Sequence, residues 1–403
     1  MTDSQNSTDS QNSTDSQNSM VSQGSLAASA APIDTGLSLP PVCYTSSTIA
    51  LDEQAIFRRC WLGVGRSDMV GSERAYRTLD IAGQSIILAR DADGDLQAFA
   101  NTCRHRGTRL LDGSGNCRAI QCPFHSWTYS FDGSLIAAPH MHDAADFDRN
   151  DFGLVSYRVE ERLGFVFVCL DPDTPDLDIV LGDFVDMHSP WPLETLVTTR
   201  RRELTVDCNW KSFLEVFNEY YHLPYVHPVS LGGLYAPPEP RDDTAGSFTT
   251  QFGLTQGTGA LLRGEQDRAF PPMPGLSGRE TNGVRYTWAF PTMTFAAGTD
   301  ALWVYEAYPL GADRCRVVQS ACFPPETLAG DGADAKLAAY HDRLDAALDE
   351  DIPALINQHR GLTNPDATQG RFQPLLEPSV AAFARWYSAE LGDREPHQGV
   401  PHS

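Results

Sequence analysis

The first half of the chain contains Cys103-Arg-His105-Arg-Gly and, after sixteen further residues from His105, Cys122-Pro-Phe-His125-Ser-Trp. Each stretch carries one thiol and one imidazole, separated by one residue in the first stretch and by two in the second. Both stretches are rich in glycine, proline and aromatic residues. Two thiolates and two imidazoles on two loops are enough to enclose a metal centre. The candidates are a zinc ion and an iron–sulfur cluster.

The distribution of the ligands distinguishes these two candidates. Zinc fingers place their two cysteines together and their two histidines together, whereas each loop here offers one of each. A Rieske [2Fe–2S] centre needs two cysteines on one iron and two histidines on the other. The two stretches resemble the Rieske family, which implies that Cys103, His105, Cys122 and His125 hold a [2Fe–2S] cluster. A zinc-stabilised binding protein is the alternative.

Two neighbouring positions indicate the kind of Rieske domain. Respiratory members of the family carry an additional cysteine in each cluster loop, and the two cysteines form a disulfide. Thr108 and Phe124 stand at the corresponding positions here, so that disulfide is absent. The chain is therefore similar to the Rieske domain of an oxygenase.

Length and composition limit the class of protein. At 403 residues the chain is long enough for two or more domains, each with its own core. Its content of 41% hydrophobic and 21% charged residues is typical of a soluble globular protein. The absence of a secretory signal, and of any run of about eighteen apolar residues, predicts a cytoplasmic protein that does not enter a membrane. The net charge of −23 opposes binding to a phosphate backbone, so we expect no nucleic-acid partner.

The sequence divides into three regions. Residues 1–36 begin with three copies of Thr-Asp-Ser-Gln-Asn-Ser, and we expect them to be disordered because they offer no apolar face to bury. Residues 46–172 predict a compact, β-rich Rieske domain around the cluster loops. Residues 176–395 predict a catalytic domain with helices beside an antiparallel sheet, so the fold class is α+β.

Hydrophobic periodicity places elements within these domains. A section at residues 228–280 is rich in proline and glycine and receives no element. Helices are predicted at residues 46–61, 180–188, 210–222, 333–358 and 379–391. Strands are predicted at residues 75–81, 84–89, 96–100, 163–170, 198–206, 284–290, 293–297, 302–309 and 314–323.

A second group of metal-binding residue types lies in the stretch Glu219-Tyr-Tyr-His222-Leu-Pro224-Tyr-Val-His227. Glu219 and His222 are three residues apart, so we expect them to share a face of the helix at 210–222. His227 lies five residues beyond His222, and Pro224 bends or ends the helix so that both imidazoles converge. Two histidines with one carboxylate form the facial triad of non-haem Fe(II) oxygenases, which leaves positions open for dioxygen.

The carboxylate of such a triad must come from another part of the chain. The late helix carries an acidic cluster, Asp345-Ala-Ala-Leu-Asp349-Glu350-Asp351. An isolated acidic cluster is usually a solvated helix face, but here the two histidines of the site are already present. We predict that Asp351 is the third ligand, with Asp349 and Glu350 as alternatives.

After residue 40 the chain resembles the large (α) subunit of a Rieske non-haem iron oxygenase. The resemblance implies a helix-grip catalytic domain, and a homotrimer in which the cluster of one subunit faces the mononuclear iron of its neighbour. It also implies that Glu219 joins the two centres, with hydrogen bonds from His222 of its own subunit and from His125 of the neighbouring subunit. Each of these histidines needs a partner for its second ring nitrogen. Ring-hydroxylating members mostly have Asp at this position, so Glu219 lengthens the bridge by one methylene.

Within the family, the chain is similar to the monooxygenases of choline, betaine and carnitine. The similarity lies in the Glu bridge and in the stretches Trp288–Pro291 and Ala301–Gly311, and it departs at Thr292, where many relatives have Asn. The aromatic residues of these stretches form either a cage for a cation or part of the core. The resemblance implies O2-dependent hydroxylation or oxidative N-demethylation of a small, quaternary ammonium substrate.

The electrons for this reaction must come from another protein. The chain contains no Gly-x-Gly-x-x-Gly fingerprint of a dinucleotide site, so we expect NAD(P)H-derived electrons through a separate flavin/iron–sulfur reductase or a ferredoxin. Two other functions are compatible with the sequence. One is the α subunit of an aromatic ring-hydroxylating dioxygenase, and the other is a Rieske electron carrier without oxygenase activity.

Overall fold

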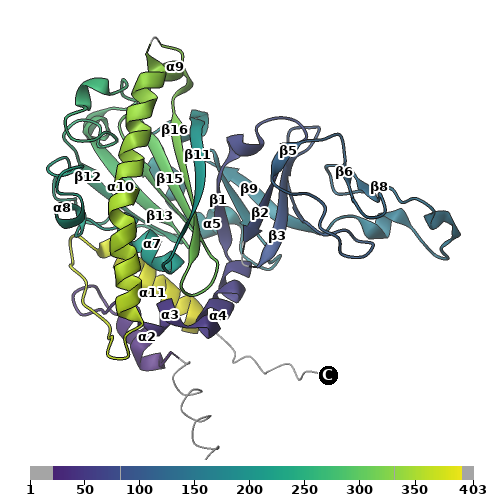
Figure 1. Ribbon diagram of the computed structural model, residues 1–403, viewed down its shortest axis with the longest axis horizontal. Coiled ribbons are helices and arrows are strands. Elements are labelled where there is room, and N and C mark those ends of the chain that lie inside the picture. The colour runs from purple at the N-terminus through teal and green to yellow at the C-terminus, as the bar shows by residue number, and fades with distance from the viewer. Residues whose placement is uncertain (1–20, 82, 331, 393–403) are drawn as a thin grey trace, which may run out of the picture.

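A computed structural model of the protein describes residues 21–81, 83–330 and 332–392. Their strands form sheets of seven, three and six strands, and all the strand pairs are antiparallel. Figure 1 shows the six-stranded sheet with its helices on one side and the smaller β-rich part on the other. This arrangement confirms the predicted α+β class.

The β-rich part contains the seven-stranded sheet, in the order β1-β10-β9-β4-β3-β2-β5, and the three-stranded sheet β6-β7-β8. Strand β10 is buried along its whole length, as its apolar sequence Phe-Val-Phe-Val-Cys predicts. The first cluster stretch lies between β4 and β5, and the second joins β6 to β7. The strands are β1 (Trp61–Arg66), β2 (Ala75–Ile81), β3 (Gln84–Arg90), β4 (Leu96–Ala100), β5 (Ser114–Asn116), β6 (Ile120–Gln121), β7 (Thr128–Tyr129), β8 (Leu135–Ala137), β9 (Ser156–Arg162) and β10 (Phe165–Cys169).

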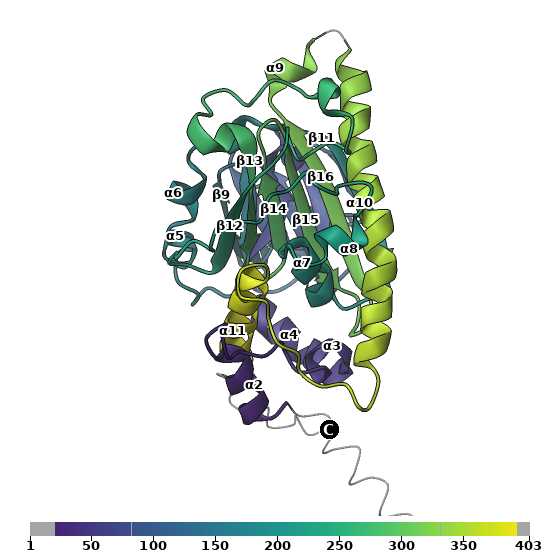
Figure 2. The ribbon, with the colours of Figure 1, turned by 90° about the vertical axis from the view of Figure 1, so that its left-hand side faces the viewer.

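The six-stranded sheet has the order β11-β16-β15-β14-β13-β12, so that consecutive strands pair from β12 to β16 and β11 adds to the far edge. Figure 2 shows helices α7, α8 and α10 in front of this sheet. The strands are β11 (Val197–Val206), β12 (Phe248–Leu254), β13 (Gly283–Ala289), β14 (Met293–Ala297), β15 (Leu302–Pro309) and β16 (Cys315–Phe323). The helices of this part are α5 (Leu177–Leu181), α6 (Phe184–His188), α7 (Trp210–Phe217), α8 (Leu223–Val226), α9 (Pro325–Leu328), α10 (Ala333–Leu362) and α11 (Pro378–Gly392).

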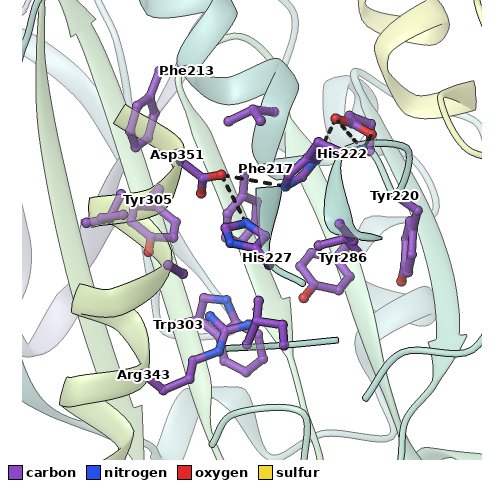
Figure 3. A pocket seen from close by; sticks show the side chains of 16 residues that line it. Phe213, Phe217, Tyr220, His222, His227, Tyr286, Trp303, Tyr305, Arg343 and Asp351 are labelled. Atoms are coloured by element: carbon purple, nitrogen blue, oxygen red, sulfur yellow. Dashed lines mark hydrogen bonds and ion pairs between the residues drawn. The ribbon is translucent and has the colours of Figure 1, made fainter. Parts of the chain in front are cut away.

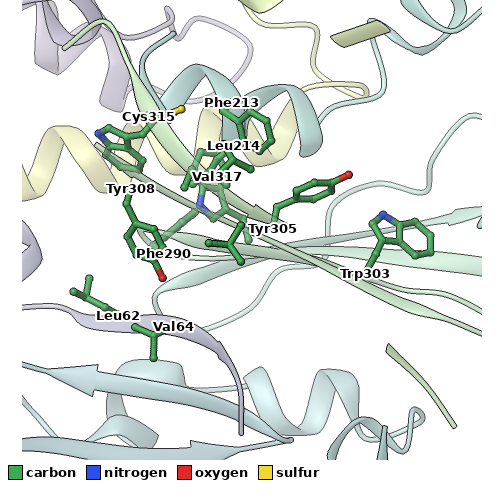
Figure 4. Packing of buried hydrophobic residues seen from close by; sticks show 14 of the residues in the cluster. Leu62, Val64, Phe213, Leu214, Phe290, Trp303, Tyr305, Tyr308, Cys315 and Val317 are labelled. Atoms are coloured by element: carbon green, nitrogen blue, oxygen red, sulfur yellow. The ribbon is translucent and has the colours of Figure 1, made fainter. Parts of the chain in front are cut away.

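One buried core joins the two parts. Leu62 and Val64 of β1 belong to the same hydrophobic cluster as Tyr308 and Val317 of the six-stranded sheet, and Figure 4 shows how these side chains lie. The contact leaves little space between the sheets, because a Cβ on Gly63 would come within 2.8 Å of the Met293 side chain. The cluster loops are therefore carried by a part of the protein that packs directly on the catalytic sheet.

The predicted helix at residues 210–222 is wrong in its extent. Helix α7 ends at Phe217, where the side-chain amide of Asn218 donates to the carbonyl of Leu214 (2.6 Å). In a continuing helix that carbonyl would accept from the backbone N–H of residue 218 instead. Pro224 then lies in the first turn of the separate helix α8, a position where proline is favoured. Proline therefore starts a second helix here rather than ending a long one.

The N-terminal prediction is also wrong for part of its length. Residues 1–20 lie outside the described residues, but residues 21–36, which we expected to be disordered, include helix α2 (Gln23–Ala30). Leu26 and Ser29 of this helix are buried. The side-chain amide of Gln369 donates to Ser29 Oγ (3.0 Å) and to the carbonyl of Ser38 (2.7 Å). Tertiary contacts thus supply the order that the small, polar sequence does not specify by itself.

Helix α4 (Ser47–Arg58) follows the short helix α3 (Val42–Thr45) and is capped by the Ser46 side chain. The sequence assigns α4 to the domain 46–172, but its buried polar contacts are with the catalytic helices. The Glu53 carboxylate pairs with Lys211 and accepts hydrogen bonds from Trp210 Nε1 (2.8 Å) and the Tyr387 hydroxyl (2.6 Å). Through Glu53, this helix of the predicted domain 46–172 is thus joined to the catalytic helices.

One strand was missed in the Pro/Gly-rich section at 228–280. Strand β12 has the sequence Phe-Thr-Thr-Gln-Phe-Gly-Leu, and its polar residues are buried with the apolar ones. Gln251 donates to the carbonyls of Glu239 and Leu375, and Thr250 donates to the carbonyl of Tyr286.

Among the described residues, none of the helices has the length and apolar character needed to cross a membrane.

Candidate metal centres and active site

The two Cys/His stretches form a matched pair of loops beside the three-stranded sheet. In each loop the carbonyl of the cysteine accepts a backbone hydrogen bond, from Gly107 to Cys103 (2.9 Å) and from Ser126 to Cys122 (3.1 Å). Gly107 and Ser126 turn the chain with φ angles of 74° and 59°. This left-handed conformation suits glycine and is uncommon for serine. Both loops therefore bend back on their cysteine in the same way.

The four predicted cluster ligands differ in burial in a way that suits a Rieske centre. Cys103 and Cys122 are buried, His105 is partly buried and His125 is exposed. The two imidazoles lie side by side, with ring centroids 4.8 Å apart, and Trp127 stacks on His105 at 4.8 Å. A cluster held here would have its thiolate iron inside and its imidazole iron at the protein surface. That surface is where an electron acceptor outside the subunit would approach.

Tyr129 is a residue of this centre that sequence reasoning missed. Its hydroxyl lies 3.3 Å from Cys103 Sγ and accepts the backbone N–H of Arg104 (3.0 Å). A cysteine that ligates a metal is a thiolate without a proton, so the Tyr129 hydroxyl would be the donor to the sulfur. Hydrogen bonds to ligand sulfurs are among the factors that set the reduction potential of an iron–sulfur cluster. The available signal was its place on β7, directly after the second cluster loop.

His222, His227 and Asp351 come together although Asp351 is far from the histidines in sequence. One ligand atom from each lies within 4.8 Å of the others. Asp351 Oδ1 is 3.0 Å from His227 Nε2 and 3.7 Å from His222 Nε2, as Figure 3 shows. The histidines flank helix α8, and Asp351 extends from α10. The arrangement fits a metal ion held by two imidazoles and one carboxylate.

The second nitrogen of each imidazole is already held by a carboxylate. His222 Nδ1 lies 2.5 Å from Glu219 Oε1, and His227 Nδ1 lies 2.6 Å from Glu350 Oε2. These contacts leave Nε2 of both rings directed at Asp351 and fix their tautomer. Glu350, an alternative third ligand in the sequence analysis, thus supports His227 instead. Asp349, the other alternative, is exposed.

Glu219 reaches His222 from a turn and not from a helix face, because α7 ends before it. Its carboxylate also accepts the backbone N–H of Tyr221 and of His222, the latter at 3.1 Å. These N–H groups lie at the start of α8, where helices leave donors without partners. Glu219 therefore orients both the His222 ring and the backbone that carries it.

A pocket opens beside the triad, and six of the sixteen residues that line it are phenylalanine, tyrosine or tryptophan (Figure 3). Its cavity volume is about 50 Å³. Phe217 of α7, Tyr286 of β13, and Trp303 and Tyr305 of β15 lie around it. Three other aromatic residues of the quoted stretches lie elsewhere: Trp288 stacks on Phe383 at 4.0 Å, Phe290 also packs on Phe383, and Tyr308 donates to Glu306. Only part of the predicted aromatic group therefore reaches the pocket.

Comparisons with known proteins agree with both halves of this arrangement. Residues 60–154 match a family model described as a Rieske [2Fe-2S] domain, and residues 193–393 match one described as the catalytic domain of a ring-hydroxylating alpha subunit. The fold is that of solved Rieske enzymes. A quaternary ammonium Rieske monooxygenase in complex with L-carnitine covers 92% of this chain and 99% of its own, with a TM-score of 0.74 at 24% identity. Naphthalene 1,2-dioxygenase from Rhodococcus sp. has the same TM-score at 18% identity and covers 93% of this chain and 99% of its own. The class is an iron-dependent oxygenase with an iron–sulfur domain.

Curated relatives make the assignment more specific. The carnitine monooxygenase oxygenase subunit of Acinetobacter baumannii is 28% identical over 305 residues, which are 75% of this chain and 80% of the relative. The glycine betaine monooxygenase oxygenase subunit of Pseudomonas aeruginosa is 26% identical over 400 residues, and covers 90% of this chain and 92% of its own. The chain belongs to the Rieske non-haem iron oxygenases, as an alpha subunit.

These families imply a Rieske [2Fe–2S] cluster and a mononuclear iron, and the residues present fit both. Asp351 Oδ1 is a buried oxygen without a hydrogen-bond donor among the described residues, and it faces two imidazole nitrogens, as a metal ligand would. When bound, the mononuclear iron activates dioxygen and the cluster supplies electrons. The protein's own part is to hold the rings through Glu219 and Glu350, and to keep water from the pocket with apolar walls.

Proposed function

We propose that this chain is the terminal oxygenase component of a Rieske system that hydroxylates, or oxidatively N-demethylates, a small quaternary ammonium compound. The observation that carries the proposal is the set of rings around the pocket, those of Phe217, Tyr286 and Tyr305. Ring faces attract a cation that has no hydrogen-bond donor of its own. The carnitine, glycine betaine and choline monooxygenases among the relatives support the same substrate class.

The geometry of the pocket also supports oxidation of a methyl group at the triad. The rings pack edge to face, with Phe217 at 5.4 Å from Tyr286 and 4.8 Å from Tyr305 between ring centroids. Glu219, His222 and Asp351 line the same pocket, so a cation held against the pocket side of these rings has its methyl groups near the metal ligands. Insertion of one oxygen atom from dioxygen into an N-methyl C–H bond, with two electrons and two protons, gives an N-hydroxymethyl group and water. That group releases formaldehyde, a proton and the tertiary amine.

We propose that the active form is a homotrimer in which electrons pass between subunits. Figure 1 shows β6 and β8, which flank the cluster loops, at one end of the molecule and α8 near the other. Phe124, beside the cluster ligand His125, is 58% exposed, and Tyr225 and Val229, beside the iron ligands, are 75% and 79% exposed. Two different surfaces with exposed apolar residues suit a head-to-tail contact, which closes into a ring.

Glu219 is the residue that would join the two centres across this contact. The Glu219 carboxylate already binds three donor groups, which are the backbone N–H groups of Tyr221 and His222 and the Nδ1 atom of His222. A carboxylate has room for about four donors, so one more hydrogen bond is possible. The neighbour's exposed cluster histidine at position 125 would supply the next one. The electrons reach the cluster from a separate reductase, with NAD(P)H as their source.

The test of the reaction is a product analysis with a matched substrate panel. Reconstituted holoenzyme, with a reductase and NADH, should consume dioxygen with glycine betaine, carnitine or choline, and should release formaldehyde where it demethylates the substrate or another oxygenated product where it hydroxylates the remaining carbon chain. Naphthalene and toluene form the arene arm, and cis-diols from them would assign the dioxygenase function instead. If the cluster is reduced but no dioxygen is consumed with any substrate of the panel, the protein is a Rieske electron carrier and not an oxygenase. His227→Ala is the control, since it should keep the cluster spectrum and lose turnover.

The test of the electron path is complementation between two inactive variants. A His125→Ala chain lacks a cluster ligand, and a His227→Ala chain lacks an iron ligand. Mixed trimers of the two regain activity only if the intact cluster of one chain reduces the iron of its neighbour. Inactive mixed trimers with both metals in place would show that the path lies within one chain.

A further inference from the structure

Arg343 brings a buried positive charge to the catalytic pocket. It lies on α10, is 4% exposed and lines the same pocket as the triad. Its guanidinium carbon lies 5.0 Å from the centroid of the Trp303 ring, and Nη2 donates to the Tyr235 hydroxyl (2.9 Å). In Figure 3, Arg343 and Trp303 lie together on the side of the pocket that is away from His222.

This guanidinium lacks the partners that other buried arginines of the protein have. Arg285 pairs with the Asp242 carboxylate at 2.6 Å. Arg66 donates to the carbonyls of residues 163, 193 and 196. No carboxylate of the described residues lies within 4.0 Å of Arg343, and the Tyr235 hydroxyl is its only hydrogen-bond acceptor among those residues. An arginine buried without an anion carries a large desolvation cost.

The surroundings of Arg343 soften this cost without removing it. The groups near the guanidinium include the phenols of Tyr235, Tyr286 and Tyr305. These phenols are neutral acceptors or ring faces, so they leave the charge uncompensated. The fork of donors on a guanidinium matches a carboxylate better than any neutral group.

We infer that Arg343 binds a carboxylate of the substrate and so sets the specificity of the pocket. The inference rests on the proposed function and narrows it: the substrate is a small zwitterion, with its ammonium among the rings and its carboxylate at Arg343. Among the described lining residues, Glu219 and Asp351 are anionic and Arg343 is the only arginine or lysine. These lining charges suit a ligand group with a single negative charge and disfavour a dianionic phosphate. It also predicts that an alcohol in place of the carboxylate is a poor ligand.

Four probes of nearly equal shape separate the two charges. Glycine betaine carries both, choline keeps only the ammonium, 3,3-dimethylbutyrate keeps only the carboxylate, and 3,3-dimethylbutan-1-ol carries neither. Calorimetric titration of the holoenzyme should give a dissociation constant for glycine betaine that is at least about tenfold lower than for choline. Choline binding as tightly as glycine betaine would overturn the role of Arg343. A dimethylbutyrate as tight as glycine betaine would instead defeat the quaternary ammonium proposal and leave the carboxylate inference standing.

Substitutions of Arg343 test whether this residue causes the preference for glycine betaine over choline. Arg343→Gln should bring the glycine betaine and choline constants to within about threefold of each other, whereas Arg343→Lys should keep part of the preference. Arg360→Gln is the matched control, because Arg360 lies on the same helix and is exposed; it should behave as the wild type. Thermal unfolding of each variant reports whether the pocket is intact. An unchanged preference in a folded Arg343→Gln enzyme would overturn the inference, and if that variant does not fold, the wild-type panel decides.

Discussion

Oε1 of Glu219 lies 2.5 Å from Nδ1 of His222, while the other oxygen of the same carboxylate accepts the backbone N–H of His222 at 3.1 Å. One side chain thus holds both the ring and the main chain of a metal ligand. Helix α8 and the imidazole cannot shift independently, because both are bound to the same carboxylate. The site is therefore preorganised on the side where the proposed neighbour would dock.

Glu219→Gln should lower turnover about 100-fold while the iron and cluster contents stay near those of the wild type. The amide keeps the shape of the side chain, but it loses the negative charge that orients the imidazolium-like N–H of His222. Stopped-flow reoxidation of the reduced cluster in the presence of dioxygen measures the step directly. Glu219→Asp is the matched control and should retain more activity, since it keeps the charge with a shorter reach. Equal losses in both variants would count against a role for the charge.

Asp351→Asn should remove most of the mononuclear iron, and Asp349→Asn should leave it in place. Asp351 Oδ1 meets both imidazoles, whereas Asp349 is exposed on the same helix. Glu350→Gln should fall between them, with iron affinity about 10- to 100-fold weaker, because Glu350 holds Nδ1 of His227. Iron analysis after anaerobic loading and desalting measures all three. Loss of iron in the Asp349 variant would show that the register of this helix has been assigned wrongly.

The position of Asp351 shows what the sequence can reveal. A helical repeat already places 351 on the same face as 344, 347, 348 and 355, all four of which are buried. That periodicity by itself separates 351 from 349. The cluster ligands could also be identified from the sequence, because an iron–sulfur centre requires particular side chains at short spacings.

Other features depend on contacts that no local pattern contains. Helix α7 ends where it does because Asn218 binds both the Leu214 carbonyl and, through its Oδ1, the Thr294 hydroxyl (3.0 Å) of the distant strand β14. Strand β12 is buried with threonine and glutamine inside it, so its pattern does not alternate. Arg343 lies on a helix of ordinary charged residues, and only the folded chain shows that it enters the pocket.

Tyr129→Phe should lower the reduction potential of the cluster by roughly 40 mV, the one-electron equivalent of a hydrogen bond worth about 1 kcal/mol. The hydroxyl lies 3.3 Å from Cys103 Sγ, and a donor there stabilises the more negative, reduced cluster. Spectroelectrochemical titration gives the value. Tyr157→Phe is the control, because the Tyr157 hydroxyl bonds to Gln84 instead (3.2 Å). A shift of the same size in both variants would point to a general change in the domain.

Glu215→Gln should change how the stability of the protein depends on pH. Glu215 lies in α7 and accepts the hydroxyl of Tyr44 (2.7 Å) from α3. Burial raises its pKa to about 7 from an ordinary value of 4.5, although the Tyr44 hydrogen bond and Lys211 oppose the rise. Between these two values the folded state holds a proton that the unfolded state releases. The contribution of Glu215 to stability is therefore complete below the lower value, falls as pH rises, and is constant above the upper one.

The Glu215→Gln variant does not lose stability in this way as pH rises, because an amide keeps the acceptor for Tyr44 and does not ionise. Its free energy of unfolding, relative to that of the wild type, should increase from pH 4.5 to pH 8 by up to about 3 kcal/mol. Urea titrations of both proteins across this range measure the difference, and Glu326→Gln, at an exposed position of α9, controls for the loss of one carboxylate. Parallel curves for the Glu215 variant and the wild type would mean that this carboxyl titrates alike in both states. In that case water or a cation reaches Glu215 in the folded protein, and the contact between α3 and α7 does not exclude solvent.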